Sequence, residues 1–80
     1  MIRIELYGVL SERTGCSAVD LPVSGPIEIE QLLHELATQW PVLADDLPRA
    51  ACAVGDTLRR RNETVSGDAP VVVLPPVSGG

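Results

Sequence analysis

One amphipathic segment constrains the fold more than any other part of this sequence. Between residues 29 and 40 the apolar side chains recur at intervals of three and four, the period of one face of an α-helix. Glu28 and Glu30 lie at its start, where the helix dipole favours acidic residues, and Pro41 ends it. We therefore expect one helix of about three turns, whose apolar face must pack on another layer of structure. The apolar stripe consists of Ile29, Leu32, Leu33, Leu36, Ala37 and Trp40.

Two short strands are predicted before this helix. Residues 2–7 alternate between apolar and polar side chains, which indicates a half-buried strand that Gly8 ends. Residues 9–15 form a connection, either a turn of helix or a loop, that closes at Gly15. Residues 17–23 alternate again, and Pro22 places that strand at an edge or near its own end. The spacing suggests a hairpin-like pair.

Further strands are predicted after the helix. Residues 41–50 form a loop with a short helical turn, and residues 51–54 and 57–61 form two strands around a Gly-Asp turn. The uninterrupted apolar run at residues 71–74 is typical of a central strand. We therefore expect a single α+β domain, with one main helix packed on a mixed sheet.

Composition excludes several classes of protein. The chain has 80 residues, of which 45% are hydrophobic, so it is long enough for one folded domain. No apolar run approaches the roughly 20 residues of a membrane span, and no signal-peptide pattern is visible, so we expect a cytoplasmic protein without a membrane partner. The net charge is −5, with no lysine and no basic stripe, which argues against a nucleic-acid partner.

Few side chains in this sequence form a pattern that is typical of catalysis. Cys16 and Cys52 are far apart and form no metal-binding pattern with the single histidine, so we expect two reduced structural thiols and no metal. His34 and Glu35 lie off the apolar stripe and are expected to face solvent. No nucleophile or phosphate-loop motif is present, so we expect no intrinsic catalytic side chains. The arginine run at residues 59–61 is compatible with an anion or acidic partner, or with a solvated sheet edge.

The C-terminal segment, VVVLPPVSGG, suggests where chemistry takes place. Pro75 and Pro76 keep the chain extended as it leaves the last strand. Gly79 and Gly80 have no side chains, so their backbone can enter a narrow channel in another protein. The carboxylate of Gly80 is a poor acyl donor until it is activated, which implies ATP and a separate activating enzyme. We therefore divide the chain into a domain of residues 1–74 and a flexible tail of residues 75–80.

Several segments together resemble the small sulfur-carrier proteins, namely the small subunit of molybdopterin synthase and its thiamine-pathway relative. They are the opening MIRIELYG followed by SERTG, the helix IEQLLHELATQWP, and the ending SGDAPVVVLPPVSGG. The resemblance implies a ubiquitin-like β-grasp fold. It also implies that Gly80 is adenylated and converted to a thiocarboxylate. The residues of the tail that would enter a partner are Gly79, Ser78, Val77, Pro76 and Pro75.

The resemblance also implies partners. These are an E1-like adenylyltransferase that consumes ATP and Mg, a sulfur donor such as a cysteine desulfurase or a rhodanese, and the large subunit of molybdopterin synthase. No cofactor is expected on the chain itself. Chain length and the proline pair favour the molybdopterin branch. The chain departs from the family pattern at Ser11, Gly55 and Leu74, where arginine, asparagine and an aromatic residue are common.

Other functions stay open at this stage. A sulfur carrier could instead serve thiamine, cysteine or secondary-metabolite synthesis, and a modifier would be attached through Gly80 to lysines of other proteins. An interaction domain with an inert tail is a further alternative. For a carrier, we expect an apolar patch around the root of the tail, made by Leu74, Val72 and Tyr7, because a tail alone binds weakly. The alternative is that Val72 and Leu74 are buried under the helix.

Overall fold

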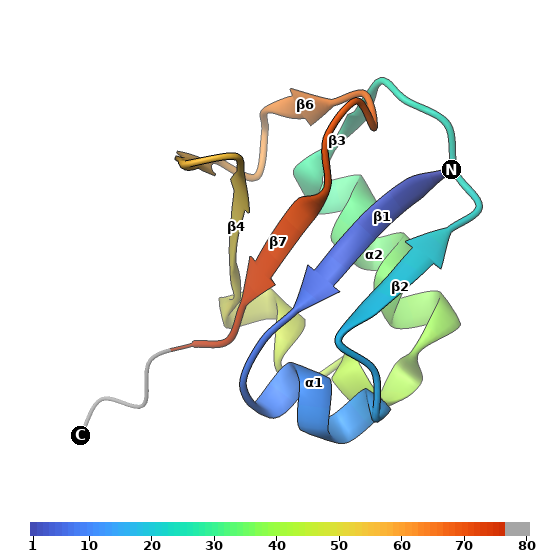
Figure 1. Ribbon diagram of the computed structural model, residues 1–80, viewed down its shortest axis with the longest axis vertical. Helices are drawn as coiled ribbons and strands as arrows, with labels where there is room; N and C mark the ends of the chain where they lie inside the picture. The colour runs from blue at the N-terminus through green and yellow to red at the C-terminus, as the bar shows by residue number, and fades with distance from the viewer. Residues whose placement is uncertain (77–80) are drawn as a thin grey trace.

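The structure is a computed structural model that describes residues 1–76 (Figure 1). Its elements follow the order expected of an α+β domain, with several short additions. They are β1 (Ile2–Leu6), α1 (Val9–Thr14), β2 (Ala18–Leu21), β3 (Ile27–Glu28), α2 (Ile29–Gln39), the 3-10 helices η1 (Pro41–Leu43) and η2 (Leu47–Arg49), β4 (Ala51–Val54), β5 (Thr57–Arg59), β6 (Thr64–Val65) and β7 (Val71–Leu74).

Five strands form one mixed sheet in the order β2-β1-β7-β4-β5. β1 runs parallel to β7, whereas the β1–β2, β4–β7 and β4–β5 pairs are antiparallel. β7 therefore occupies the centre, as its apolar run predicted. β3 and β6 form a separate two-stranded ribbon. Each has only two residues, which is too short for the alternation that reveals a strand in sequence.

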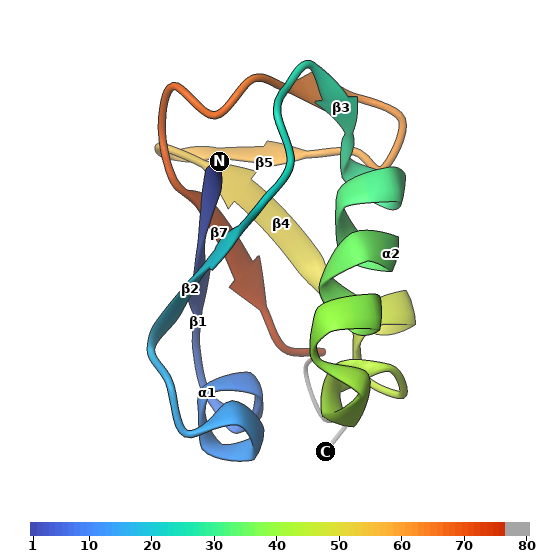
Figure 2. The same cartoon turned by 90° about the vertical axis from the view of Figure 1, so that its right-hand side faces the viewer.

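The core lies between α2 and one face of the sheet, here called the inner face (Figure 2). Four residues of the predicted stripe are buried, and Ala37 and Trp40 are partly buried against them. Burying one such aliphatic side chain contributes roughly 1.5–3 kcal/mol. The inner-face residues they meet include Ile2, Ile4, Leu6, Val71 and Val73.

Several segments differ from the sequence-based expectation, beginning with β1, which ends at Leu6 and not at Tyr7. Residues 41–50 contain two 3-10 helices where one short helical turn was expected, and Pro41 begins the first of them. The strand expected at residues 57–61 ends at Arg59, because the chain then turns and Glu63 N–H donates to the Arg60 carbonyl. β2 ends at Leu21, before Pro22, which cannot donate a ladder hydrogen bond.

The N-terminus of α2 has no side-chain cap. Instead, the N–H groups of Ile29 and Glu30 donate to the carbonyls of Glu63 and Arg61, each over 2.9 Å. The turn at residues 60–63 thus supplies acceptors for backbone donors that would otherwise lack partners within the helix.

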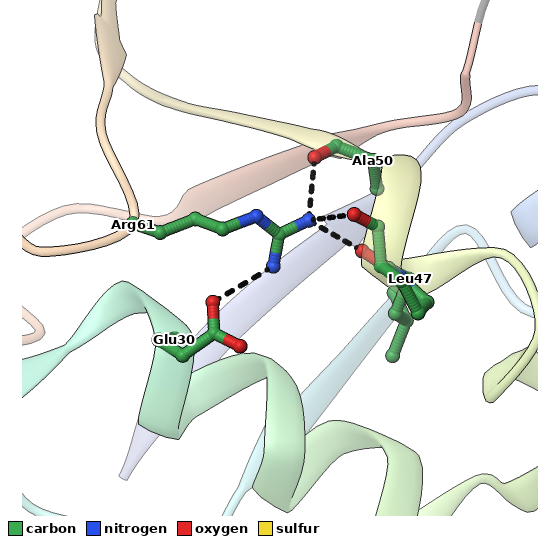
Figure 3. Close-up of polar contacts among 5 residues, drawn as sticks. Glu30, Leu47, Ala50 and Arg61 are labelled. Carbon is green, nitrogen blue, oxygen red and sulfur yellow. Dashed lines mark hydrogen bonds and ion pairs between the residues drawn. The ribbon is translucent and has the colours of Figure 1, made fainter.

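The side chain of Arg61 strengthens the same junction (Figure 3). Its Nη2 donates to the carbonyls of Leu47, Pro48 and Ala50, at 2.6, 2.8 and 3.0 Å. Its Nη1 donates to Glu30 Oε2 over 3.2 Å. Bonds from a charged, planar guanidinium are stronger than neutral ones, so this residue fixes η2 beside the first turn of α2.

The arginine run therefore does not behave as a uniform solvated edge. Arg61 is structural and Arg59 pairs with Glu63 over 3.5 Å, whereas Arg60 is exposed. The backbone N–H of Arg60 lies 2.7 Å from Glu63 Oε2, and this hydrogen bond, together with the nearby arginine charges, holds the pKa of Glu63 below its usual value. Glu63 thus organises the turn that caps α2.

Replacing Arg61 should destabilise the domain. We expect Arg61→Ala to lose about 2 kcal/mol of unfolding free energy, because three carbonyls lose a charge-assisted donor at once. Arg61→Lys should recover only a small part, since an ammonium cannot reproduce the planar fork. Arg60→Ala removes the same charge from an exposed position and should change stability by less than about 0.5 kcal/mol. Urea unfolding measures all three, and equal effects of Arg61→Ala and Arg60→Ala would contradict the assignment.

The two cysteines are free, as expected, and differ in environment. Cys52 is buried on the inner face, and burial raises the pKa of its thiol to about 11 despite the opposing effect of the Arg61 charge. Cys16 is half-buried. Because the thiolate is the reactive form, Cys52 should react slowly near neutral pH.

Alkylation followed by mass spectrometry can check this difference. At pH 8 we expect iodoacetamide to modify Cys16 first and Cys52 only after denaturant is added. A Cys16→Ser variant isolates the second thiol. If Cys52 in that folded variant reacted as fast as a free thiol in solution, its predicted burial would be wrong.

Candidate functional site

The face of the sheet opposite α2, the outer face, is the candidate site. Val71 and Val73 of β7 are 0% exposed on the inner face, while Val72 and Leu74 alternate to the other side and are half-buried. No helix of residues 1–76 covers this outer face (Figure 2). The alternative in which the helix buries Val72 and Leu74 is therefore wrong. Their expected role in partner binding stays a prediction.

Strand register extends this surface across β4 to β5. Val72 pairs with Ala53, which in turn pairs with Leu58, and Leu74 pairs with Ala51. Leu58 is 67% exposed and lies on the edge strand. We call these five residues the outer apolar patch: Ala51, Ala53, Leu58, Val72 and Leu74.

Leu58 was missed in the sequence because its neighbours are polar. Only its register with Ala53 shows that it adjoins Val72 across β4. Side chains alternate along a strand, so the half-buried Arg59 on one face places Leu58 on the other face of β5. This alternation is the one local signal that could have indicated the direction of Leu58.

Tyr7 lies at the end of the sheet where the tail begins. β1 and β7 are parallel, with Leu6 opposite Val73, so the next position along brings Tyr7 beside Leu74. Tyr7 is 49% exposed, and its hydroxyl donates to Glu5 Oε1 over 3.3 Å. With Arg3, Glu5 and Ala18 it lines a shallow hollow on the β2 side of β1, so its expected place in the apolar patch stays a prediction.

The tail itself is described only at its root. Pro75 and Pro76 follow β7 directly and are half-buried. Val77, Ser78, Gly79 and Gly80, the remaining predicted tail residues, lie outside the described residues. Their roles stay predictions.

Metal-ligating clusters and membrane-spanning helices are both absent from the described residues. Within residues 1–76, no three His, Cys, Asp or Glu side chains gather closely enough to hold a metal ion. His34 is exposed on α2, as its position off the stripe predicted, and α2 packs on the inner face. In that same part of the chain, no helix is long and apolar enough to span a bilayer.

Comparisons with known proteins agree with this description. The model of the ThiS family matches residues 4–80, nearly the whole chain. A crystal structure of SAMP1 from Haloferax volcanii superposes with a TM-score of 0.79 at 22% identity, covering 99% of this chain and 98% of that one. A crystal structure of H. volcanii small archaeal modifier protein 1 gives 0.80 at 18% identity, covering 95% and 97%. No curated protein matches the chain.

The structural matches share the fold over nearly their full lengths, which confirms the predicted ubiquitin-like β-grasp. At these identities they show the fold alone. The family model goes further, because it covers the sheet, the helix and the Gly-Gly ending together. The chain belongs to the ThiS family of ubiquitin-like sulfur carriers.

Proposed function

We propose that the chain is a sulfur carrier whose Gly80 carboxylate is the reactive group. An E1-like enzyme would transfer AMP from ATP to this carboxylate and release pyrophosphate. A persulfide sulfur would then attack the acyl carbon and displace AMP, and reduction of the resulting acyl disulfide by a thiol would leave a thiocarboxylate. The net change replaces one carboxylate oxygen by sulfur.

One observation carries this proposal. β7 contributes Val72 and Leu74 to the outer apolar patch and continues without a break into Pro75. A partner docked on the patch is therefore next to the origin of the tail. The six residues 75–80 span at most about 20 Å, at roughly 3.3 Å each, which is enough to reach a buried active site. Docking on the patch also offsets the entropy lost when the tail is ordered.

We further propose the large subunit of molybdopterin synthase as the acceptor of the sulfur. The proline pair before the last four residues and the length of 80 residues support this branch over the thiamine branch. The sulfur donor would be a cysteine desulfurase or a rhodanese. The chain needs no cofactor of its own for this role.

A protein modifier is the second candidate, and the structural neighbours favour it. Both are structures of a protein named as a modifier, and they match this chain along its length. The same adenylated terminus would then react with a lysine amine of a target. This sequence contains no lysine, so its own side chains could not extend such a conjugate into a chain.

Intact-mass spectrometry tests the carrier function. The full chain is incubated with ATP, Mg, a sulfide source and the adenylating enzyme of the same cell. We expect a gain equal to the mass of sulfur minus that of oxygen, and no gain in a variant that lacks Gly80. That deletion should leave stability unchanged, because a terminal residue beyond the sheet contributes little. Adducts of the chain with other proteins, without the sulfur gain, would favour the modifier.

The acceptor is tested separately by adding purified large synthase subunit to the thiocarboxylate form. Sulfur transfer to its pterin precursor would support the molybdopterin branch. Transfer only to the acceptor of another pathway would exclude it while leaving the carrier chemistry intact.

Charges placed on the outer apolar patch should weaken partner binding. We expect Leu58→Asp and Leu74→Asp each to raise the Kd for the adenylating enzyme about 10-fold or more, since a carboxylate would be desolvated in the interface. Val42→Asp is the matched control, because Val42 is 50% exposed on η1, away from the outer face. Isothermal titration measures the three affinities. Folded Leu58→Asp and Leu74→Asp variants that bind like the wild type would rule out the patch.

A further inference from the structure

The first turn after β1 lies against the root of the tail. β1 and β7 are parallel neighbours that end at the same side of the sheet (Figure 1). The chain leaves β1 through Tyr7 and Gly8 into α1, and leaves β7 through Pro75 into the tail. The two exits are therefore adjacent.

Gly8 and Pro75 approach so closely that no side chain fits between them. A Cβ on Gly8 would lie 2.9 Å from Pro75 Cγ and 3.7 Å from Cδ. Gly15 and Gly55 also have positive φ, at 72° and 62°, but nothing lies within 4 Å of the corresponding Cβ positions. Close approaches also occur for a Cβ at Gly25, 2.5 Å from Ser66 Cα, and at Gly67, 3.2 Å from Ile2 Cγ1, but among the described glycines only Gly8 meets the root of the tail.

The backbone of Gly8 is itself restricted to glycine. Its φ of 59° and ψ of −133° mirror the polyproline region, which L-residues do not occupy without strain. This conformation sets the direction in which α1 starts, and it turns the bare Cα of Gly8 towards the ring of Pro75.

We propose that Gly8 is a positioning residue for the tail: the Pro75 ring packs on its Cα, and this contact fixes the direction in which the chain leaves the outer apolar patch at Pro75. This inference rests on the proposed function. Because the proline ring fixes its own φ, holding the ring also constrains the start of the tail. When the tail is fully extended, with a span of at most about 20 Å, a small rotation at the root would displace its end by several ångströms.

In this proposal, binding of the partner and delivery of the carboxylate to the adenylating site depend on different residues. A partner recognises the outer apolar patch, which Gly8 does not join. The reacting carboxylate reaches the adenylating site in the correct position only when the root is held. Misplacing a reacting group by about 1 Å can cost about 100-fold in rate, so a defect at Gly8 should appear in kcat more than in KM.

Stereochemistry at position 8 gives a sharp test. The full chain can be assembled by ligating a synthetic 1–15 peptide to residues 16–80, which begin with Cys16. Gly8→Ala places its methyl towards Pro75. Gly8→D-alanine favours the same φ and ψ and places its methyl at the other α-hydrogen. Gly15→Ala controls for a positive φ without any contact to the tail.

Two readouts are measured on each folded variant. Nuclear Overhauser effects between position 8 and the Pro75 ring report the contact directly. Steady-state adenylation by the enzyme of the same cell, with ATP and Mg, gives kcat and KM for the carrier.

We expect Gly8→Ala to lose the Overhauser contact and to lower kcat about 10-fold or more, with KM changed less than about twofold. The D-alanine and Gly15→Ala variants should retain both the contact and kcat. If Gly8→Ala does not fold, Pro75→Ala removes the ring from the other side of the contact, and it should lower kcat in the same way.

Wild-type kcat in a folded Gly8→Ala chain, or an equal loss in the Gly15→Ala control, would overturn the proposal. So would an absence of Overhauser effects between Gly8 and Pro75 in the wild type. A wild-type chain that is not adenylated at all would refute the proposed function instead, and the Overhauser measurement would still decide whether Gly8 holds the root.

Discussion

Arg61 joins parts of the domain that the ladder hydrogen bonds of the sheet leave separate. Its guanidinium holds the carbonyls of residues 47, 48 and 50 against Glu30, while its own carbonyl accepts the Glu30 N–H. α2 has no capping side chain, so its first turn depends on these bonds. The start of β4 follows Ala50 directly. The junction at Arg61 therefore links the first turn of α2 to η2 and to the residue before β4.

The placement of β7 matters for function because its side chains contribute to both faces of the sheet. Val71 and Val73 belong to the core, and Val72 and Leu74 to the outer apolar patch. Since side chains alternate with a period of two, a register slip of one residue would exchange the two sets. Pairing with β1 on one side and β4 on the other fixes the register. The packing that stabilises the domain thus also determines which residues the outer face presents at the root of the tail.

Local patterns in the sequence predicted the elements whose signal is periodic. α2 and β1 were identified in this way, and the uninterrupted apolar run identified the central β7. The outward direction of Val72 and Leu74 was one of two alternatives in the sequence, and the alternation of burial along β7 decides between them. Features that depend on long-range contacts were not predicted. The role of Arg61 depends on carbonyls 11 to 14 residues away, which any residue type supplies. Leu58 joins the patch only through register with Ala53, and Gly8 meets Pro75 only because β1 and β7 are parallel neighbours.

The size of the domain explains why its proposed chemistry would depend on a partner. A chain of 80 residues buries only about 60% of its unfolded surface, and here the apolar residues of the sheet and α2 are committed to one core. A partner could bind the outer face without disturbing the residues of that core. Acid, base and nucleotide chemistry would then come from the protein that receives the tail. Under the proposed function, one β-grasp domain would serve a sulfur acceptor or a lysine conjugation enzyme, and the active site of the partner would decide between them.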